Sequence, residues 1–168
     1  GTTVGGNLTY VTGGSHTCSV SGSTSSQSSE IPAEDFPITQ PQIDNWKAET
    51  ANGTAKSAYT INSNATVTES SSVIITGNMS VGSGATWNLM GTTKIIGNLT
   101  IGSNAHINLS GTLYVTGTIS FGSWSITQLH SSYGSGSGVI LSGGVMTVGS
   151  DSTIQGSGQM GSYMLVLS

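Results

Sequence analysis

Few side chains in this 168-residue chain could act as acids, bases or metal ligands. Hydrolysis of a glycosidic bond needs a pair of carboxylates, and lyase chemistry usually needs acidic metal ligands together with a Lys or Arg base. Between Val73 and Ser168 the only carboxylate is Asp151 and the only cation is Lys94. We therefore expect that the protein is not an enzyme and has no catalytic residue, no cofactor and no metal ion.

Three histidines are the other candidates for a base or a metal ligand. His106 takes the position that Thr86 has in the preceding copy of a repeated sequence, and His130 lies beside a Gly/Ser-rich segment. We interpret both of them, and His16, as solvated surface residues. The segments GGVMTVGS and GSGSG lack the lysine of a phosphate-binding loop, so they do not predict a nucleotide site.

Charged residues are scarce, which narrows the classes of partner. The chain has three lysines, no arginine and seven carboxylates, for a formal net charge of −4. Only 6% of its residues are charged, against about a quarter in ordinary globular proteins. Such a surface cannot form a basic patch for phosphates, so we expect no nucleic-acid partner. No stretch has the length of a membrane span, and the single cysteine, Cys18, cannot form an internal disulfide.

A repeated sequence supplies the scaffold on which any site must lie. From Val73 onward the chain reads VIITGNMSVGS, then KIIGNLTIGS, then LYVTGTISFGS. Gly77, Gly97 and Gly117 recur at one fixed spacing, and Gly144 follows after a longer interval. A fixed period that is rich in β-branched residues and interrupted by Gly-Ser corners predicts a β-solenoid, whose coils stack along one axis.

Alignment of the repeats predicts which side chains face inward. We predict an all-β fold, a right-handed three-sided parallel β-helix with one short α-helix, in a single domain over residues 1–168. The longer spacing before Gly144 places a loop insertion at residues 131–138. The predicted inward columns are Met79, Leu99, Ile119 and Met146; Val81, Ile101, Phe121 and Val148; Ile75, Ile95 and Val115; Trp87 and Ile107; and Leu89, Leu109 and Leu129.

Residues 29–53 interrupt the coils and hold all three prolines and five of the seven carboxylates. A proline near the start and a glycine after the end predict a short helix from Pro41 to Ala51. Ile43 and Trp46 lie on one face of this helix and are expected to pack on the solenoid. This segment is either a clamp on the stack or a partner-binding arm.

An uncharged polar strip is predicted between two inward columns, and it is our candidate binding face. It is either the solvated side of a sheet or a repetitive surface for an ordered ligand such as a glycan or ice. Asn-x-Ser/Thr triplets begin at six asparagines and arise by composition in a chain this rich in Asn, Ser and Thr. Stacked Asn side chains can also form a hydrogen-bonded ladder along a solenoid, and glycosylation is a secondary alternative. The strip consists of Ser80, Thr100, Ser120 and Thr147, with Asn78, Asn98 and Thr118 beside them, and the six asparagines are Asn7, Asn52, Asn64, Asn78, Asn98 and Asn108.

The two ends of the predicted stack are candidates for self-assembly. A solenoid leaves backbone groups unpaired at its first and last coils unless a cap covers them. The segment GGNLTYV reads as an ordinary coil, and YMLVLS reads as an apolar strand. Pairing between two such ends propagates head to tail into a fibre. The candidate residues are Leu8, Tyr10, Met164, Leu165, Val166 and Leu167.

The segments FPITQPQIDNWKAE, GNLTIGSNAHINLSGTLYVTG, SSYGSGSGVILSGG and QGSGQMGSYMLVLS together resemble a known group of proteins. They are similar to the predicted β-helix proteins of the cell envelope of candidate-phylum bacteria, which often carry PilX-like or pilin-like N-termini. The resemblance implies an extracellular, surface or pilus-associated protein, and it offers no established enzymatic activity or catalytic residues to carry over. A looser likeness, carried by the short coil alone, is to the bactofilins, which polymerise end to end.

Overall fold

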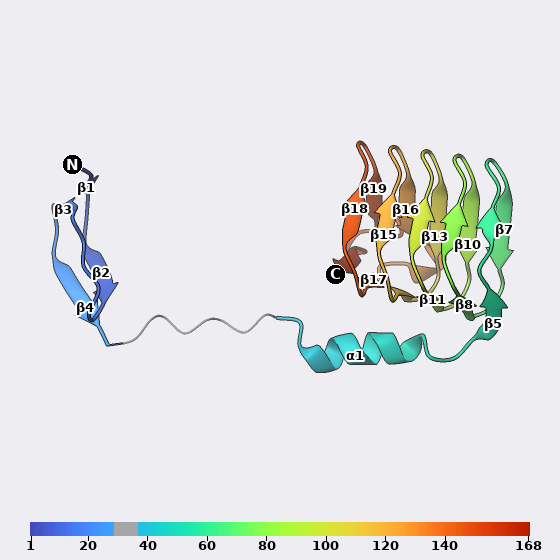
Figure 1. Cartoon of the computed structure of the whole chain (residues 1–168), viewed down its shortest axis with the longest axis horizontal. Helices are drawn as coiled ribbons and strands as arrows, with labels where there is room; N and C mark the ends of the chain where they lie inside the picture. Colours follow the sequence, from blue (N-terminus) through green and yellow to red (C-terminus); the bar gives the residue numbers. More distant parts are fainter. Residues whose placement is uncertain (29–36) are drawn as a thin grey trace. The chain divides into compact units, whose positions relative to one another are not determined.

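The computed structural model describes residues 1–28 and 37–168 and divides the chain into two compact units, Gly1–Pro37 and Ile38–Ser168. We call them unit 1 and unit 2 (Figure 1). This arrangement differs from the single solenoid domain predicted over residues 1–168, because the first four strands pair only among themselves. Each unit is therefore described separately.

Unit 2 is a three-sided parallel β-helix, as predicted. Every strand pairs in parallel with the equivalent strand of a neighbouring coil, and Figure 1 shows the coils stacked side by side along one axis. The first sheet contains β5 (Thr54–Ser57), β8 (Val73–Thr76), β11 (Thr93–Ile96), β14 (Leu113–Val115), β17 (Gly138–Ser142) and β20 (Met164–Leu167). The second contains β6 (Thr60–Ile61), β9 (Met79–Val81), β12 (Leu99–Ile101), β15 (Ile119–Phe121) and β18 (Met146–Val148). The third contains β7 (Thr66–Glu69), β10 (Thr86–Leu89), β13 (His106–Leu109), β16 (Ile126–Leu129) and β19 (Thr153–Gln155).

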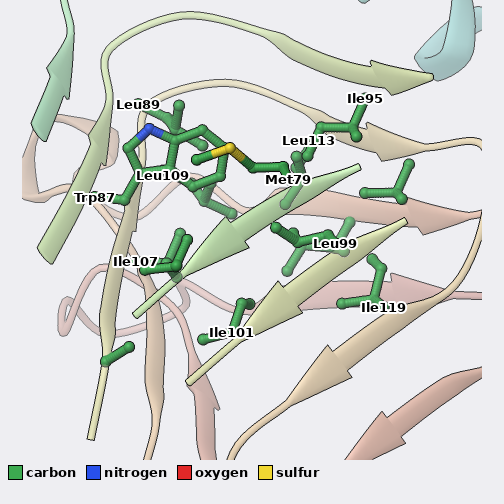
Figure 2. Packing of buried hydrophobic residues seen from close by; sticks show 14 of the residues in the cluster. Met79, Trp87, Leu89, Ile95, Leu99, Ile101, Ile107, Leu109, Leu113 and Ile119 are labelled. Carbon is green, nitrogen blue, oxygen red and sulfur yellow. The ribbon is translucent and has the colours of Figure 1, made fainter. Parts of the chain in front are cut away.

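The predicted inward columns form the core of unit 2. In the middle coils their side chains are almost completely buried, and Figure 2 shows Trp87, Leu89, Leu99 and Ile107 converging from the second and third sheets. Burial of one such side chain stabilises a fold by roughly 1.5–3 kcal/mol. Because each coil adds the same columns, the core is continuous along the stack.

The corner between the second and third sheets has one backbone conformation in all five coils. One residue per coil adopts a positive φ there: Asn64, Gly84, Asn104, Trp124 and Asp151. Glycine, Asn and Asp tolerate this left-handed conformation, whereas a larger side chain costs roughly 1–2 kcal/mol. Trp124, with φ 62°, is therefore the strained member of the series.

The predicted helix is present as α1, Gln40–Glu49, in unit 2. It begins one residue earlier than predicted, where the backbone N–H of Thr39 donates to Oε1 of Gln42 at 2.9 Å. It ends two residues earlier, before Thr50. Ile43 and Trp46 are half-buried, and residues 29–36 of the interruption lie outside the described part of the chain.

Polar contacts join the C-terminal end of α1 to the first sheet. The Thr112 hydroxyl donates to Oε2 of Glu49 at 2.6 Å, and the Lys47 ammonium lies 5.8 Å from the centre of the Tyr114 ring. These contacts fit a clamp on the stack better than a free arm.

The insertion at residues 131–138 has more structure than the predicted loop. It opens with a 3-10 helix, η1 (Ser131–Tyr133), and β17 begins at Gly138. A second loop from the last coil holds it in place, because Ser162 Oγ donates to the carbonyl oxygen of Gly136 at 2.6 Å and Ser157 Oγ donates to that of Gly134.

Unit 1 is a smaller solenoid fragment. Its strands are β1 (Thr3–Val4), β2 (Leu8–Val11), β3 (Ser19–Val20) and β4 (Thr24–Gln27), and they form two parallel pairs, β1 with β3 and β2 with β4. Paired residues are 16 positions apart, as for Thr9 and Ser25, so its coil is shorter than that of unit 2. None of the residues described in unit 1 is buried.

Candidate binding surfaces and coil ends

The predicted polar strip forms on the outer face of the second sheet. Ser80, Thr100, Ser120 and Thr147 stand in register on β9, β12, β15 and β18, and all four reach solvent. The strip therefore has the flat, regular geometry that the sequence predicted. Its use as a binding face stays a prediction.

The asparagines beside this strip stabilise the coils. The backbone N–H of Asn98 donates to Oδ1 of Asn78 at 2.9 Å, and the backbone N–H of Thr118 donates to Oδ1 of Asn98 at 2.9 Å. Each side-chain carbonyl thus satisfies a backbone group of the following coil at the corner before the strand. These two asparagines have a structural role, which reduces the part of the predicted face that is free to bind a ligand.

A continuous chain of side-chain hydrogen bonds runs along the outer face of the third sheet. We call it the amide ladder. Of the six asparagines of the Asn-x-Ser/Thr triplets, Asn108 alone belongs to it, and it lies on another sheet from the candidate face. In each step the side-chain amide nitrogen of one residue lies 2.7–3.1 Å from the side-chain oxygen of the member in the preceding coil. In chain order the members are Thr68, Asn88, Asn108, Gln128 and Gln155.

The first coil of unit 2 has an ion pair with a buried carboxylate, which sequence reasoning missed. Glu69 is in register with Leu89 and Leu109 and faces inward, with 6% of its surface exposed. Lys56 Nζ lies 2.6 Å from Oε2 of Glu69, and the Tyr59 hydroxyl donates to Oε1 at 2.5 Å. We call Lys56, Tyr59 and Glu69 the polar cap, because they close the apolar core at this end.

The contacts within the polar cap shift the ionisation of its members. Burial alone would raise the pKa of Glu69, but the hydrogen bonds from Lys56 and Tyr59 outweigh burial and lower the pKa of this carboxyl below its ordinary value. Burial and the hydrogen bond to Glu69 raise the pKa of Tyr59. Both carboxylate oxygens are occupied by these partners, and glycoside hydrolysis needs a second carboxylate. The cluster is thus suited to a structural role.

The last coil of unit 2 is open by comparison. Val148 belongs to the inward column of Val81, Ile101 and Phe121, yet 57% of its surface is exposed. Val166 follows Leu113 and Ile140 in another inward column, and it is 37% exposed. The side chains of the last coil are therefore in register with the inward columns, as predicted for Val148. No further coil among the described residues covers them.

Most of the predicted assembly residues lie at open strand edges. Met164, Leu165 and Leu167 are half-buried on β20, which pairs on one side with β17 and is the terminal strand of its sheet in the described residues. Leu8 and Tyr10 are half-buried on β2 of unit 1. The structure thus provides two sets of parallel strands with free edges, one in each unit.

The histidines and the cysteine do not form a reactive cluster. His106 is exposed on β13 as predicted, whereas His130 is half-buried and its Nδ1 accepts from the backbone N–H of Ser132 at 3.2 Å. His16 lies 3.8 Å from the sulfur of Cys18 in unit 1. Within residues 1–28 and 37–168 there is no group of three or more His, Cys, Asp or Glu side chains that could hold a metal ion.

No helix in the described part of the chain has the length and apolar character needed to cross a membrane. In comparisons with known proteins, no family model, no curated protein and no solved structure matches this chain.

Proposed function

We propose that the protein is a non-enzymatic structural module of the bacterial cell surface that assembles head to tail with copies of itself into a filament or pilus-like appendage. The observation that carries this proposal is the open last coil. Val148 and Val166 occupy inward positions but are 57% and 37% exposed, whereas Ile61, inward in the first coil, is 1% exposed. Apolar side chains in core columns indicate a surface that a further layer of coils would bury.

Unit 1 of a second copy is the partner that we propose for this surface. Its strands are parallel, its edges are free and it buries none of its described residues. A pair of strands this small is marginal alone and gains stability by packing against further strands. Stacking of β2, which carries Leu8 and Tyr10, on β20 would cover apolar side chains of both partners.

The first coil of unit 2 is a poorer partner for the open end. Its core is closed by the polar cap, and contact with the apolar end would remove the half-exposed Lys56 ammonium from water. Desolvation of such a charge opposes stacking. The contact is therefore heterologous, from the last coil of one copy to unit 1 of the next, and a contact of this type propagates.

Placement on a bacterial surface is a separate part of the proposal. It rests on the resemblance of the helix segment and the coils to cell-envelope β-helix proteins. The rarity of charged residues supports the absence of a nucleic-acid partner.

Sedimentation velocity over a range of protein concentrations, with electron microscopy of the concentrated samples, tests the assembly. We expect end-to-end oligomers for the parent chain and monomers for Val166→Lys, because a charge on the uncovered column must be desolvated on stacking. Ile96→Lys is a matched control, since Ile96 is an exposed apolar residue of a middle coil. A parent chain that stays monomeric at every concentration, or oligomers that Val166→Lys leaves unchanged, would contradict the proposal.

A further inference from the structure

A cavity of about 400 Å³ lies on the outer face of the third sheet. Asn88, Asn108 and Gln128 of the amide ladder line one part of it. His130 and Ser131 of the insertion and Ser157 of the last loop line another. The loops of the last two coils therefore turn part of a flat sheet into a concave site, and its volume is within the range of small-molecule sites, about 300–1,000 Å³.

The ladder leaves hydrogen-bonding capacity that faces this cavity. A primary amide has two N–H donors and an oxygen with two lone pairs. Asn108 uses one N–H on Oδ1 of Asn88 and one lone pair on the N–H of Gln128. Each inner amide thus keeps one donor and one acceptor site. Consecutive strands are about 4.8 Å apart, so these pairs of sites recur at that spacing along the groove.

Two further residues give the cavity a polar donor and an apolar surface. Nδ1 of His130 accepts from the backbone N–H of Ser132, and neutral imidazole then carries its proton on Nε2 as a donor. Met90, which also lines the cavity, is 40% exposed. A ligand with hydroxyl groups on its edges and C–H groups on its faces would meet both kinds of contact.

In the part of the chain that the structure describes, the lining contains no carboxylate, lysine or arginine. We propose that this groove binds a neutral polysaccharide, with its sugar units placed along the amide ladder from Thr68 to Gln128. The spacing between rungs is close to the length of one sugar unit in an extended chain, and the four rungs from Thr68 to Gln128 span about 14 Å. This site is on the third sheet, so it is distinct from the polar strip on the second sheet and from β20, the strand proposed for end-to-end assembly.

A glycan array followed by calorimetric titration of the full chain tests the proposal. The titrations use cellohexaose, mannohexaose and maltohexaose as neutral probes and oligogalacturonate as an anionic one. We expect at least one neutral glycan to bind and oligogalacturonate not to bind. Asn108→Leu, which removes the central amide, and Met90→Glu, which leaves the ladder intact, should each weaken binding about tenfold.

Two control variants make the outcome specific. Asn108→Gln keeps an amide in a column that already accepts Gln at position 128, so it should retain most of the affinity. Thr100→Leu alters the polar strip in the same coil and should leave the affinity unchanged. The proposal is overturned if no neutral glycan binds, if the anionic probe or an uncharged peptide binds better, or if Thr100→Leu abolishes binding while Met90→Glu does not.

Discussion

The first and last coils of unit 2 contribute strands to the same three sheets but have opposite chemistry. In the first coil, an inward position of the leucine column is occupied by Glu69, which Lys56 and Tyr59 neutralise and hydrogen-bond. In the last coil, inward positions are occupied by Val148 and Val166, which remain exposed. Both ends present strand edges, so the backbone does not distinguish them. A few inward side chains therefore determine whether an end coil caps the solenoid or can stack on a further coil.

The largest expected effect on the free energy of unfolding comes from a Val/Ile→Asp change in one inward column, made once in a middle coil and once in the last coil. Ile101→Asp places a carboxylate in the middle of the core and should cost more than about 4 kcal/mol of unfolding free energy. Val148→Asp should cost less than about 1 kcal/mol, because the side chain already reaches water. Urea denaturation at low protein concentration measures both. Equal losses would show that the last coil is covered after all.

Removal of one partner from the polar cap is the next test. Lys56→Met leaves the buried Glu69 carboxylate without its cation, and we expect a loss of about 2 kcal/mol, below the value for a fully buried pair because Lys56 is partly solvated. The double variant Lys56→Met with Glu69→Leu extends the leucine column and should recover the stability. It should also allow the first coil to stack on the last coil of another copy, and sedimentation velocity would detect this association. A double variant as unstable as Lys56→Met would contradict this role of the cap.

The pH dependence of stability gives a smaller effect with a defined sign. The folded-state pKa of Glu69 lies below its unfolded value, so the unfolded chain binds this proton more readily. The stabilisation is complete above the unfolded pKa and is lost as the pH falls through the folded pKa. Glu69→Gln should therefore be less sensitive to acid than the parent in urea midpoints measured from neutral to acidic pH. Parallel curves for the two proteins would exclude Glu69 as the responsible group.

The smallest effect is at a corner that the two end coils share. Asn64 in the first coil and Asp151 in the last adopt the left-handed conformation easily, and Trp124 between them does not. Trp124→Asn should raise the unfolding free energy by about 1 kcal/mol, since Trp124 is exposed and little packing is lost. Thermal and urea unfolding measure the gain. No change in association is expected, because Trp124 belongs to the coil before the last and lies at a corner, outside the strands proposed to stack.

The periodic part of the fold was predictable from the sequence for a physical reason. Parallel coils repeat the same environment at a fixed interval along the chain, so Leu89 and Leu109 had to share a column. The same period extended backwards from Leu89 reaches Glu69, and extended forwards from Asn88 it reaches Asn108 and Gln128. The positions of Glu69 and of most of the amide ladder could therefore be predicted from the same period. They were missed because these residues are polar, whereas the repeat was recognised from its apolar residues.

Other features had no signal of that kind. Unit 1 has a shorter coil, and the likeness of GGNLTYV to the longer repeat concealed the change of period. The cavity depends on hydroxyl groups of Ser157 and Ser162 that bond to carbonyl oxygens of the insertion, which is distant from them in the sequence. In a chain so rich in serine, nothing marks these two as the ones that shape a site.

Strands of one coil pair only with strands of the adjacent coils, and this affects how the number of coils can change in evolution. Each strand in the middle coils of unit 2 bonds to the coil before and the coil after it, and the corner conformation is the same from coil to coil. An in-frame duplication of one repeat would insert one coil, extend every column and the amide ladder by one rung, and leave the polar cap and the last coil as they are. Duplication or deletion of a repeat can thus change the length of the solenoid by one coil at a time. Related genes can therefore encode solenoids of different length that keep the same first and last coils.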